Sequence, residues 1–173
     1  MRIHRMIHMA AAVAMAAALM LSPAGTAAQA SGDTVLTRTD TQKLLPEKVY
    51  YKGQSATVQV RNSGGVKFAD GYYMLTTLVD TSGYSSDIQA KYSAYLLAEV
   101  PIKFGGKTLA AGAYGLGFVG NQFLVTDLGA HDVLSVPSAQ DAEIKRPTPL
   151  QVLADPGGGY RLYEGRLYVK FSR

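Results

Sequence analysis

The feature that most constrains the fold is a regular alternation of short apolar segments with turn-forming residues. From Leu44 onward, Gly, Asn, Asp or Pro interrupts the chain about every eight to twelve residues, and β-branched and aromatic residues fill the segments between. No long amphipathic helix pattern competes with this one. We therefore expect an all-β fold over residues 44–173, a single antiparallel β-sandwich or a flattened barrel.

The expected strands lie between these turn residues. We place them at Val49–Tyr51, Ser55–Arg61, Tyr72–Val79, Tyr92–Leu97, Val100–Phe104, Tyr114–Val119, Gln122–Leu128, Val133–Val136, Leu150–Leu153, Tyr160–Tyr163 and Arg166–Phe171. Ser55–Arg61 and Arg166–Phe171 alternate apolar and polar residues, so each predicts one buried and one solvated face. Tyr72–Val79 is largely apolar on both faces, which predicts a central strand.

The clearest hairpin connects Tyr114–Val119 to Gln122–Leu128. Gly120-Asn121 between them suits a primed turn, which needs a positive φ.

Residues 87–99 allow two interpretations. Ile88, Tyr92, Tyr95 and Leu96 have the spacing of one face of a short helix. The alternative is a strand over the second half of this segment. We favour the strand, because the flanking pattern is β throughout and Pro101 is tolerated at a sheet edge or bulge.

Residues 1–30 have the three parts of a secretory signal peptide. Arg2 and Arg5 form a basic beginning, Met9–Leu21 is an apolar stretch, and small residues end at Ala30 in an A-x-A pattern. An ordinary helix and a membrane anchor are the alternatives, but the apolar stretch is shorter than the roughly 20 residues of a membrane span. We expect cleavage after Ala30, export by a bacterial cell to the periplasm or the medium, and no membrane span in the mature chain.

Residues 31–43 are polar and rich in Thr and Asp. Val35 and Leu36 are their only large apolar side chains. So little apolar surface does not offset the entropy lost on ordering a backbone. A flexible leader is therefore expected before the domain.

The residue inventory excludes several kinds of chemistry. The chain has no cysteine and no tryptophan, and His131 is the one histidine beyond residue 30. Thiol catalysis, disulfides and metal sites built on cysteine or several histidines are excluded, so no cofactor and no metal are expected. The net charge is +4, but the basic residues are scattered and do not form the stripe of a nucleic-acid-binding protein. We expect no nucleic-acid partner.

The most distinctive string is GGKTLAAGAYGL at residues 105–116. It predicts two tight turns around a short apolar anchor, Leu109. A strand follows, entered through Gly112, where we expect a positive φ or a close backbone contact. Gly115 and Gly117 leave one face of that strand smooth, so that an aromatic ring or another backbone segment can approach closely.

This string resembles the G-G-K-x-L-x-A-G-x-Y signature of a family of exported bacterial β-sandwich proteins of unknown function. The resemblance spans Val100–Gly129 and extends, more loosely, to the L-x-x-G-x-Y turn of many small β-sandwich modules. It implies an exported β-sandwich and no particular reaction. A nucleotide-binding P-loop at Gly106-Lys107-Thr108 is rejected, because Pro101 stands where that motif needs a glycine and no helix pattern follows.

Residues 127–132 hold the one candidate for polar chemistry. His131 stands between Asp127 and Asp132, and histidine titrates near neutral pH. Ser135 is near enough in sequence to suggest a nucleophile. A triad or metal site needs partners from separate elements, so we expect both aspartates to cap turns and His131 to hydrogen-bond locally. The alternatives are ligand or cation binding and a periplasmic hydrolase centred on His131.

Tyrosines and arginines supply the candidate ligand-binding residues. Adjacent tyrosines on a strand point to opposite faces, so one member of each pair lies outside or at a rim. Near the C-terminus, arginines alternate with tyrosines and carboxylates, which predicts cross-strand ion pairs and Arg–Tyr stacking, or an anionic-ligand site. The candidate ligand-binding residues are Tyr72, Tyr73, Asp127, His131, Arg146, Arg161, Tyr163 and Arg166.

These observations favour an exported, non-catalytic β-sandwich that acts by binding or structural association in the cell envelope. Its partner would be an envelope protein or a small ligand. The alternative is a small-ligand-binding barrel or sandwich, in which tyrosines and arginines anchor the ligand in an apolar pocket. A closed barrel with a cavity would favour this carrier, and a cleft joining His131 to a distant carboxylate and serine would favour the enzyme.

Overall fold

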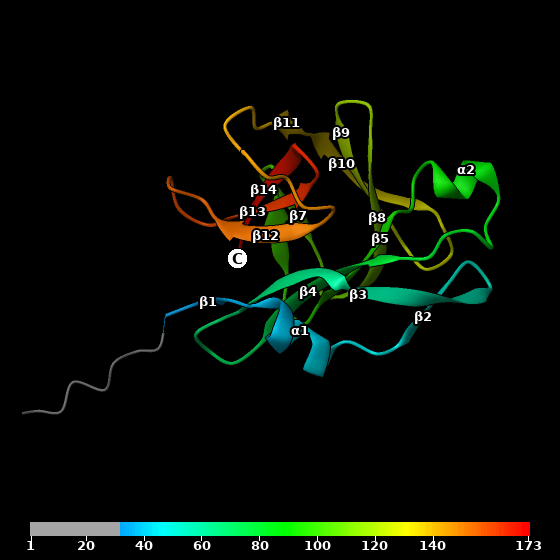
Figure 1. Ribbon diagram of the computed structural model, residues 1–173, viewed down its shortest axis with the longest axis horizontal. Helices are drawn as coiled ribbons and strands as arrows, with labels where there is room; N and C mark the ends of the chain where they lie inside the picture. Colours follow the sequence, from blue (N-terminus) through cyan, green and yellow to red (C-terminus); the bar gives the residue numbers. More distant parts are fainter. Residues whose placement is uncertain (1–31) are drawn as a thin grey trace, which may run out of the picture.

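The computed structural model describes residues 32–173, so the predicted signal peptide lies outside the described residues. Two antiparallel sheets pack against each other, which confirms the expected all-β sandwich. Figure 1 shows the orange and red strands of one sheet lying across the blue-green strands of the other. Over this range, no helix has the length and apolar character needed to cross a membrane.

The first sheet has eight strands within residues 32–173. They are β1 (Thr34–Val35), β2 (Lys48–Tyr51), β3 (Gln54–Lys67), β4 (Tyr73–Val79), β5 (Ala94–Ala98), β8 (Gly112–Val119), β9 (Gln122–Thr126) and β10 (Asp132–Pro137). Their order is β1-β3-β4-β5-β8-β9-β10, and β2 pairs with the beginning of β3. The expected central strand is β4, which lies between β3 and β5 and is buried from Met74 to Thr77.

The second sheet has six strands in the same described range. They are β6 (Ile102–Phe104), β7 (Lys107–Leu109), β11 (Ala139–Gln140), β12 (Gln151–Ala154), β13 (Tyr160–Glu164) and β14 (Leu167–Ser172). Their order is β12-β13-β14-β6-β7, and β11 pairs with β14. The chain first passes from the first sheet to the second through residues 99–101, which connect β5 to β6 and end at Pro101.

The main core lies between the two sheets. Phe104 of β6 packs against Phe123 of β9 and Phe171 of β14, with ring centroids 5.0 and 5.5 Å apart. Leu116 and Leu162 are fully buried in the same cluster. Aromatic and aliphatic side chains from both sheets therefore fill the interior of the sandwich.

A second, smaller core lies where the hairpin of β2 and the beginning of β3 folds over the other strands of the first sheet. Tyr51, Tyr84 and Tyr92 form its centre, and all three are buried. The smooth face predicted for β8 lies beneath them. A Cβ added to Gly115 would lie 2.5 Å from the Tyr51 ring, and one added to Gly117 would lie 2.5 Å from the Lys91 carbonyl oxygen. The predicted close approach of a ring and a backbone segment is confirmed.

The expectation of a flexible leader over residues 31–43 is wrong for residues 34–43. β1 pairs with β3, and helix α1 (Arg38–Leu44) follows it. Thr37 caps this helix, because its hydroxyl accepts from the Asp40 amide while the Asp40 carboxylate accepts from the Thr37 amide. The Thr41 hydroxyl then bonds the Ser63 hydroxyl at 2.6 Å. The segment is ordered by strand pairing and capping, and so needs few apolar side chains.

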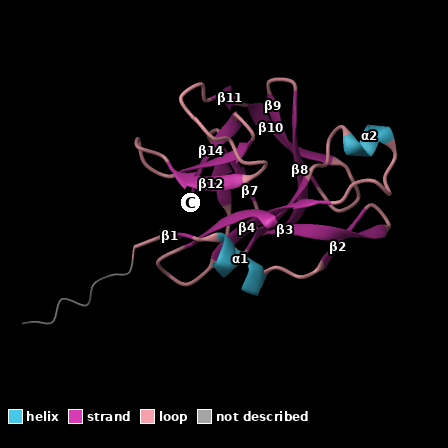
Figure 2. Cartoon of the chain, in the orientation of Figure 1, coloured by secondary structure: helices cyan, strands magenta, loops and turns pink. Residues whose placement is uncertain are grey.

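The segment at 87–99 contains the favoured strand, β5, preceded by one helical turn, α2 (Ser86–Gln89). Within residues 32–173 the helices are α1 and α2. Figure 2 shows both of them outside the sheets. The hairpin prediction is confirmed, since Gly120 has a φ of 58° and Val119 pairs with Gln122.

The prediction for Gly112 is wrong. Gly112 begins β8 without a positive φ, and the contact that an added Cβ would make is with the Tyr114 side chain, 2.9 Å from its hydroxyl oxygen. The positive φ values of this string belong instead to Gly105 and Gly106, at 52° and 86°, which form the turn between β6 and β7.

Candidate functional site

Six of the eight candidate residues from the sequence lie in three separate places. Tyr72 and Tyr73 stand at the beginning of β4, where the Tyr73 amide donates to a Glu99 carboxylate oxygen at 2.8 Å. Tyr72 is half exposed, and the Arg173 guanidinium lies 6.0 Å from its ring centre. The Tyr72 ring therefore remains half exposed, and the tyrosine pair does not join the other candidates.

Asp127 and His131 form the turn between β9 and β10. One Asp127 carboxylate oxygen accepts from the Gly129 and His131 amides at 2.8 and 2.9 Å, and the other lies 3.0 Å from His131 Nδ1. The hydrogen bonds from the His131 amide and ring, with that from Gly129, lower the Asp127 pKa. The expected turn cap and local histidine contact are confirmed.

The remaining polar groups near His131 make contacts with other residues. Asp132 does not cap the turn, because its carboxylate pairs with Lys91 Nζ at 3.2 Å. The Ser135 hydroxyl donates to the Gln122 side-chain oxygen at 3.2 Å. The His131 side chain is 78% exposed. The geometry describes a stabilised turn on the surface.

Arg161 of β13 lies at the centre of the third place, the surface of the second sheet that faces away from the core. Its Nε donates to the Asp155 carboxylate, which also accepts from Lys170 Nζ at 3.1 Å and the Gly157 amide at 2.7 Å. The Arg161 guanidinium carbon lies 4.7 Å from the Tyr168 ring centre. The predicted ion pairing and Arg–Tyr stacking are confirmed here.

The Asp155 side chain is 1% exposed beneath these cations. Its pKa is lowered to about 2, first by the hydrogen bond from Arg161 and next by that from the Gly157 amide, against the effect of burial. The carboxylate is therefore ionised through the neutral and mildly acidic range. It holds Arg161 and Lys170 in fixed positions.

A second carboxylate, Asp141, approaches the cluster from the loop between β11 and β12. The Tyr163 hydroxyl donates to it at 2.8 Å, and Arg161 Nη1 lies 3.4 Å from the same oxygen. The Tyr163 hydrogen bond is the main cause of the lowered Asp141 pKa. The Tyr163 and Tyr168 ring centroids are 5.2 Å apart. Arg161 is thus held in position by ion pairs with two carboxylates and by its contact with the Tyr168 ring.

The other two candidate arginines are not part of this cluster. Arg166 Nη1 donates to backbone carbonyls of the loop that follows β11, the shortest bond being 2.7 Å to the Ile144 oxygen. Arg146 is exposed on the same loop, and no ion pair joins it to another described residue. Arg166 therefore fixes the loop that delivers Asp141, and Arg146 is exposed on that loop.

The register of the second sheet arranges the exposed side chains in order. Leu153 on β12, Arg161 on β13 and Lys170 on β14 are directly opposite one another. Ser172 follows on the same side of β14 and is opposite Lys103 on β6. We call this set of residues the outer face: Leu153, Arg161, Tyr168, Lys170, Ser172 and Lys103.

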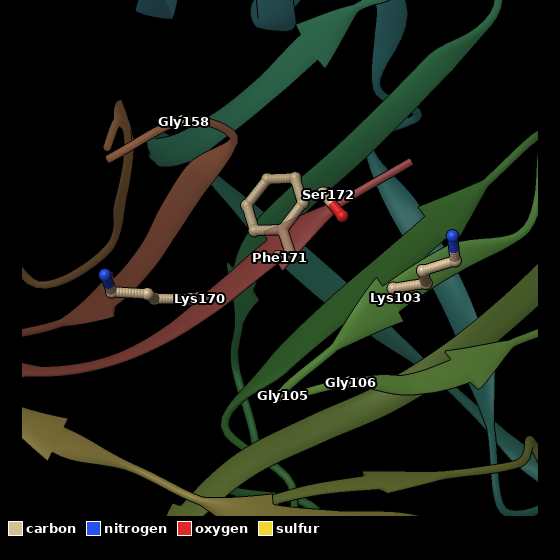
Figure 3. Close-up of a pocket in the computed structure, with 7 residues that line it drawn as sticks. All are labelled: Lys103, Gly105, Gly106, Gly158, Lys170, Phe171 and Ser172. Carbon is tan, nitrogen blue, oxygen red and sulfur yellow. The ribbon is translucent and has the colours of Figure 1, made fainter. Parts of the chain in front are cut away.

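A cavity of about 340 Å³ opens at one end of the outer face. Figure 3 shows Lys103 and Lys170 on either side of Phe171 and Ser172. Gly158 borders the cavity on one side and the Gly105-Gly106 turn on the other. A Cβ added to Gly106 or Gly158 would meet nothing within 4 Å, so the glycines leave the backbone bare at the rim.

Sequence reasoning missed Lys103 and Lys170. Alternation along Arg166–Phe171 already places Lys170 on the polar face, so one signal was present. No local sequence pattern predicts that β6 pairs with β14, because these two strands lie far apart in the sequence. Among residues 32–173, no group of three or more His, Cys, Asp or Glu side chains is arranged to hold a metal ion.

Comparisons with protein-family models, curated proteins and solved structures find no match to this chain.

Proposed function

We propose that this protein is an exported, non-catalytic binding module of the cell envelope and that the outer face is its binding surface. The signal-peptide pattern of residues 1–30 supports export. The single observation that carries the binding role is the fixed position of Arg161, which two carboxylates and the Tyr168 ring hold in one orientation. A pre-organised arginine beside an aromatic ring loses little entropy when it binds a partner.

An exposed apolar side chain completes this surface. Leu153 is 40% exposed and is directly opposite Arg161 across the β12–β13 pair. Lys170, with 58% of its side chain exposed, continues the row on β14. Arginine and tyrosine are enriched in binding hot spots, and here Arg161 lies over the Tyr168 ring, beside the exposed Leu153 and Lys170.

The packing supports a surface site over an internal one. Phe104, Phe123 and Leu116 fill the space between the sheets, and the 340 Å³ cavity opens on the outside of the second sheet. The turn at His131 also supports a non-catalytic role. The His131 ring contacts Asp127, and the Ser135 hydroxyl donates its hydrogen bond to Gln122 and not to His131.

The test is sedimentation of the purified protein with envelopes isolated from the cells that make it. Leu153→Asp should lower the bound fraction about tenfold, because it places a negative charge on the surface directly opposite Arg161. Val119→Asp is the matched control, since Val119 is also 40% exposed but stands at the far end of a hairpin of the first sheet. Equal binding by both variants and the original protein would overturn the proposal. Export itself is tested by N-terminal sequencing of extracellular or periplasmic material, which should begin at Ser31.

A further inference from the structure

We propose that the free edge of β2 binds the same edge of a second copy of this chain, in an antiparallel dimer that places Lys48 of each copy opposite Tyr50 of the other. Among residues 32–173, β2 pairs with β3 and with no other strand. Figure 1 shows β2 at the margin of the molecule, on the first sheet, whereas the outer face belongs to the second sheet. The dimer therefore uses a surface separate from that of the proposed function.

The backbone of β2 has outward-pointing groups at two residues. The Val58 amide donates to the Glu47 carbonyl oxygen at 3.0 Å, so Glu47 and every second residue after it direct their backbone groups toward β3. The N–H and C=O groups of Lys48 and Tyr50 point the other way, along the free edge of the strand. Such an edge is a template on which another strand can pair.

The free edge ends on both sides of these two residues. Pro46 has no N–H to donate, and the Lys52 amide already donates to the Leu128 carbonyl oxygen at 2.8 Å. Each copy therefore offers two donors and two acceptors, from Lys48 and Tyr50. With Lys48 of each copy opposite Tyr50 of the other, all of these groups pair, and Pro46 then faces Lys52 where the ladder stops. The edge is complementary to itself about a two-fold axis.

The side chains of β2 favour this register over the neighbouring ones. Val49 and Tyr51 are buried, whereas Lys48 is exposed and Tyr50 is 55% exposed on the opposite face. The register places each Lys48 ammonium group beside the Tyr50 ring of the other copy, a cross-strand cation–π pair. Pairing Tyr50 with Tyr50 would set Lys48 against Lys52, and pairing Lys48 with Lys48 would also oppose like charges, which is unfavourable.

The first arm measures association of the purified mature protein by sedimentation equilibrium over a wide concentration range. So short a contact gives a weak, concentration-dependent dimer. Lys48→Glu should weaken association about tenfold, because it replaces the cation beside the ring with a carboxylate. Lys145→Glu, at an exposed loop position, is the matched control and should associate like the original protein. Stronger association of Lys48→Glu would point to pairing of residue 48 with Lys52 and would refute the proposed register.

The second arm uses the absence of cysteine from the chain to test the register directly. Lys48→Cys and Tyr50→Cys are mixed in equal amounts and oxidised with diamide, because residues opposite each other in an antiparallel ladder, about 5.5 Å apart at Cα, are within disulfide range. The mixed disulfide should form about tenfold faster than the cross-linked dimer of Val119→Cys, a control at another exposed position. A rate no higher than that of the control, or faster cross-linking of either β2 variant by itself, would show the dimer to be wrong.

Discussion

The Tyr51 ring stacks on the Tyr92 ring, with centroids 3.8 Å apart and planes inclined by 17°, against the bare backbone of Gly115. The Tyr51 hydroxyl continues past this glycine to the Thr126 hydroxyl at 2.7 Å. A ring can lie this close to a strand only where the strand has no side chain. The stack therefore joins the β2–β3 hairpin to β8 and β9 of the first sheet.

Gly115→Ala should destabilise the protein by about 1–3 kcal/mol, because the added methyl group forces the tyrosine rings to move in a packed core. A Cβ at this position would lie 2.5 Å from the Tyr51 ring and 2.9 Å from the Tyr92 ring. Urea denaturation measures the change. Gly83→Ala is the control, since its nearest neighbour would be 3.8 Å away. Equal midpoints for the two variants would show that the rings adapt without strain.

The glycines of β8 show what local sequence determines. Gly115 and Gly117 alternate with bulky residues, so a smooth face was predictable from the strand period alone. The identities of the groups that cover that face were not, because Tyr51 and Lys91 reach it through the folding of the β2–β3 hairpin and of the α2 segment. Sequence alternation specifies which face is empty, and tertiary topology decides what occupies it.

The same distinction applies to the candidate site. The Asp127–His131 turn and the pairing of Arg161 with Asp155 follow from residues near one another in sequence, and both were predictable. The contact of Arg161 with Asp141, twenty residues away, was not. Lys103 reaches the outer face only because β6 pairs with β14. The order of residues 34–43 was missed for another reason. The prediction counted apolar residues, whereas the capping box of Thr37 and Asp40 that stabilises this segment is polar.

Glu164 links the two sheets and should make stability depend on pH. Its carboxylate accepts from the Ser93 hydroxyl at 2.9 Å, and burial raises its pKa against the effect of this hydrogen bond. The folded protein therefore binds the proton more tightly than the unfolded chain. The stability that this gives is present below the ordinary pKa of 4.5 and is lost as the pH rises through the raised pKa.

Glu164→Gln should accordingly raise the melting temperature at neutral pH, because the amide keeps an acceptor for Ser93 without a buried charge. The advantage should disappear below pH 4.5, where Glu164 is protonated in both states. Melting curves recorded across this range measure it. Glu143→Gln, at an exposed loop position, should show no such pH-dependent gain. A variant that is less stable than the original protein at neutral pH would contradict the prediction.

Thr37→Ala should cost about 1 kcal/mol of stability, because it removes the hydroxyl that caps α1. Urea denaturation measures the loss, and hydrogen exchange at the Asp40 and Thr41 amides should become faster. Thr39→Ala, an exposed threonine inside the same helix, is the control. Unchanged exchange at Asp40 would mean that packing against β3 holds the helix without its cap.

His131→Ala separates a structural turn from a catalytic base. Asp127 keeps its hydrogen bonds from the Gly129 and His131 amides in this variant, since only the ring contact at 3.0 Å is lost. Because the ring is largely exposed, stability should fall by less than about 1 kcal/mol, and binding to envelopes should be unchanged. Denaturation and sedimentation measure these two properties. A general base would behave differently, since its removal lowers turnover by about 10²-fold or more while the fold is kept. A hydrolytic activity of the original protein that vanished in this variant, with an unchanged circular dichroism spectrum, would therefore refute the non-catalytic role and identify Asp127 as the group that orients the histidine.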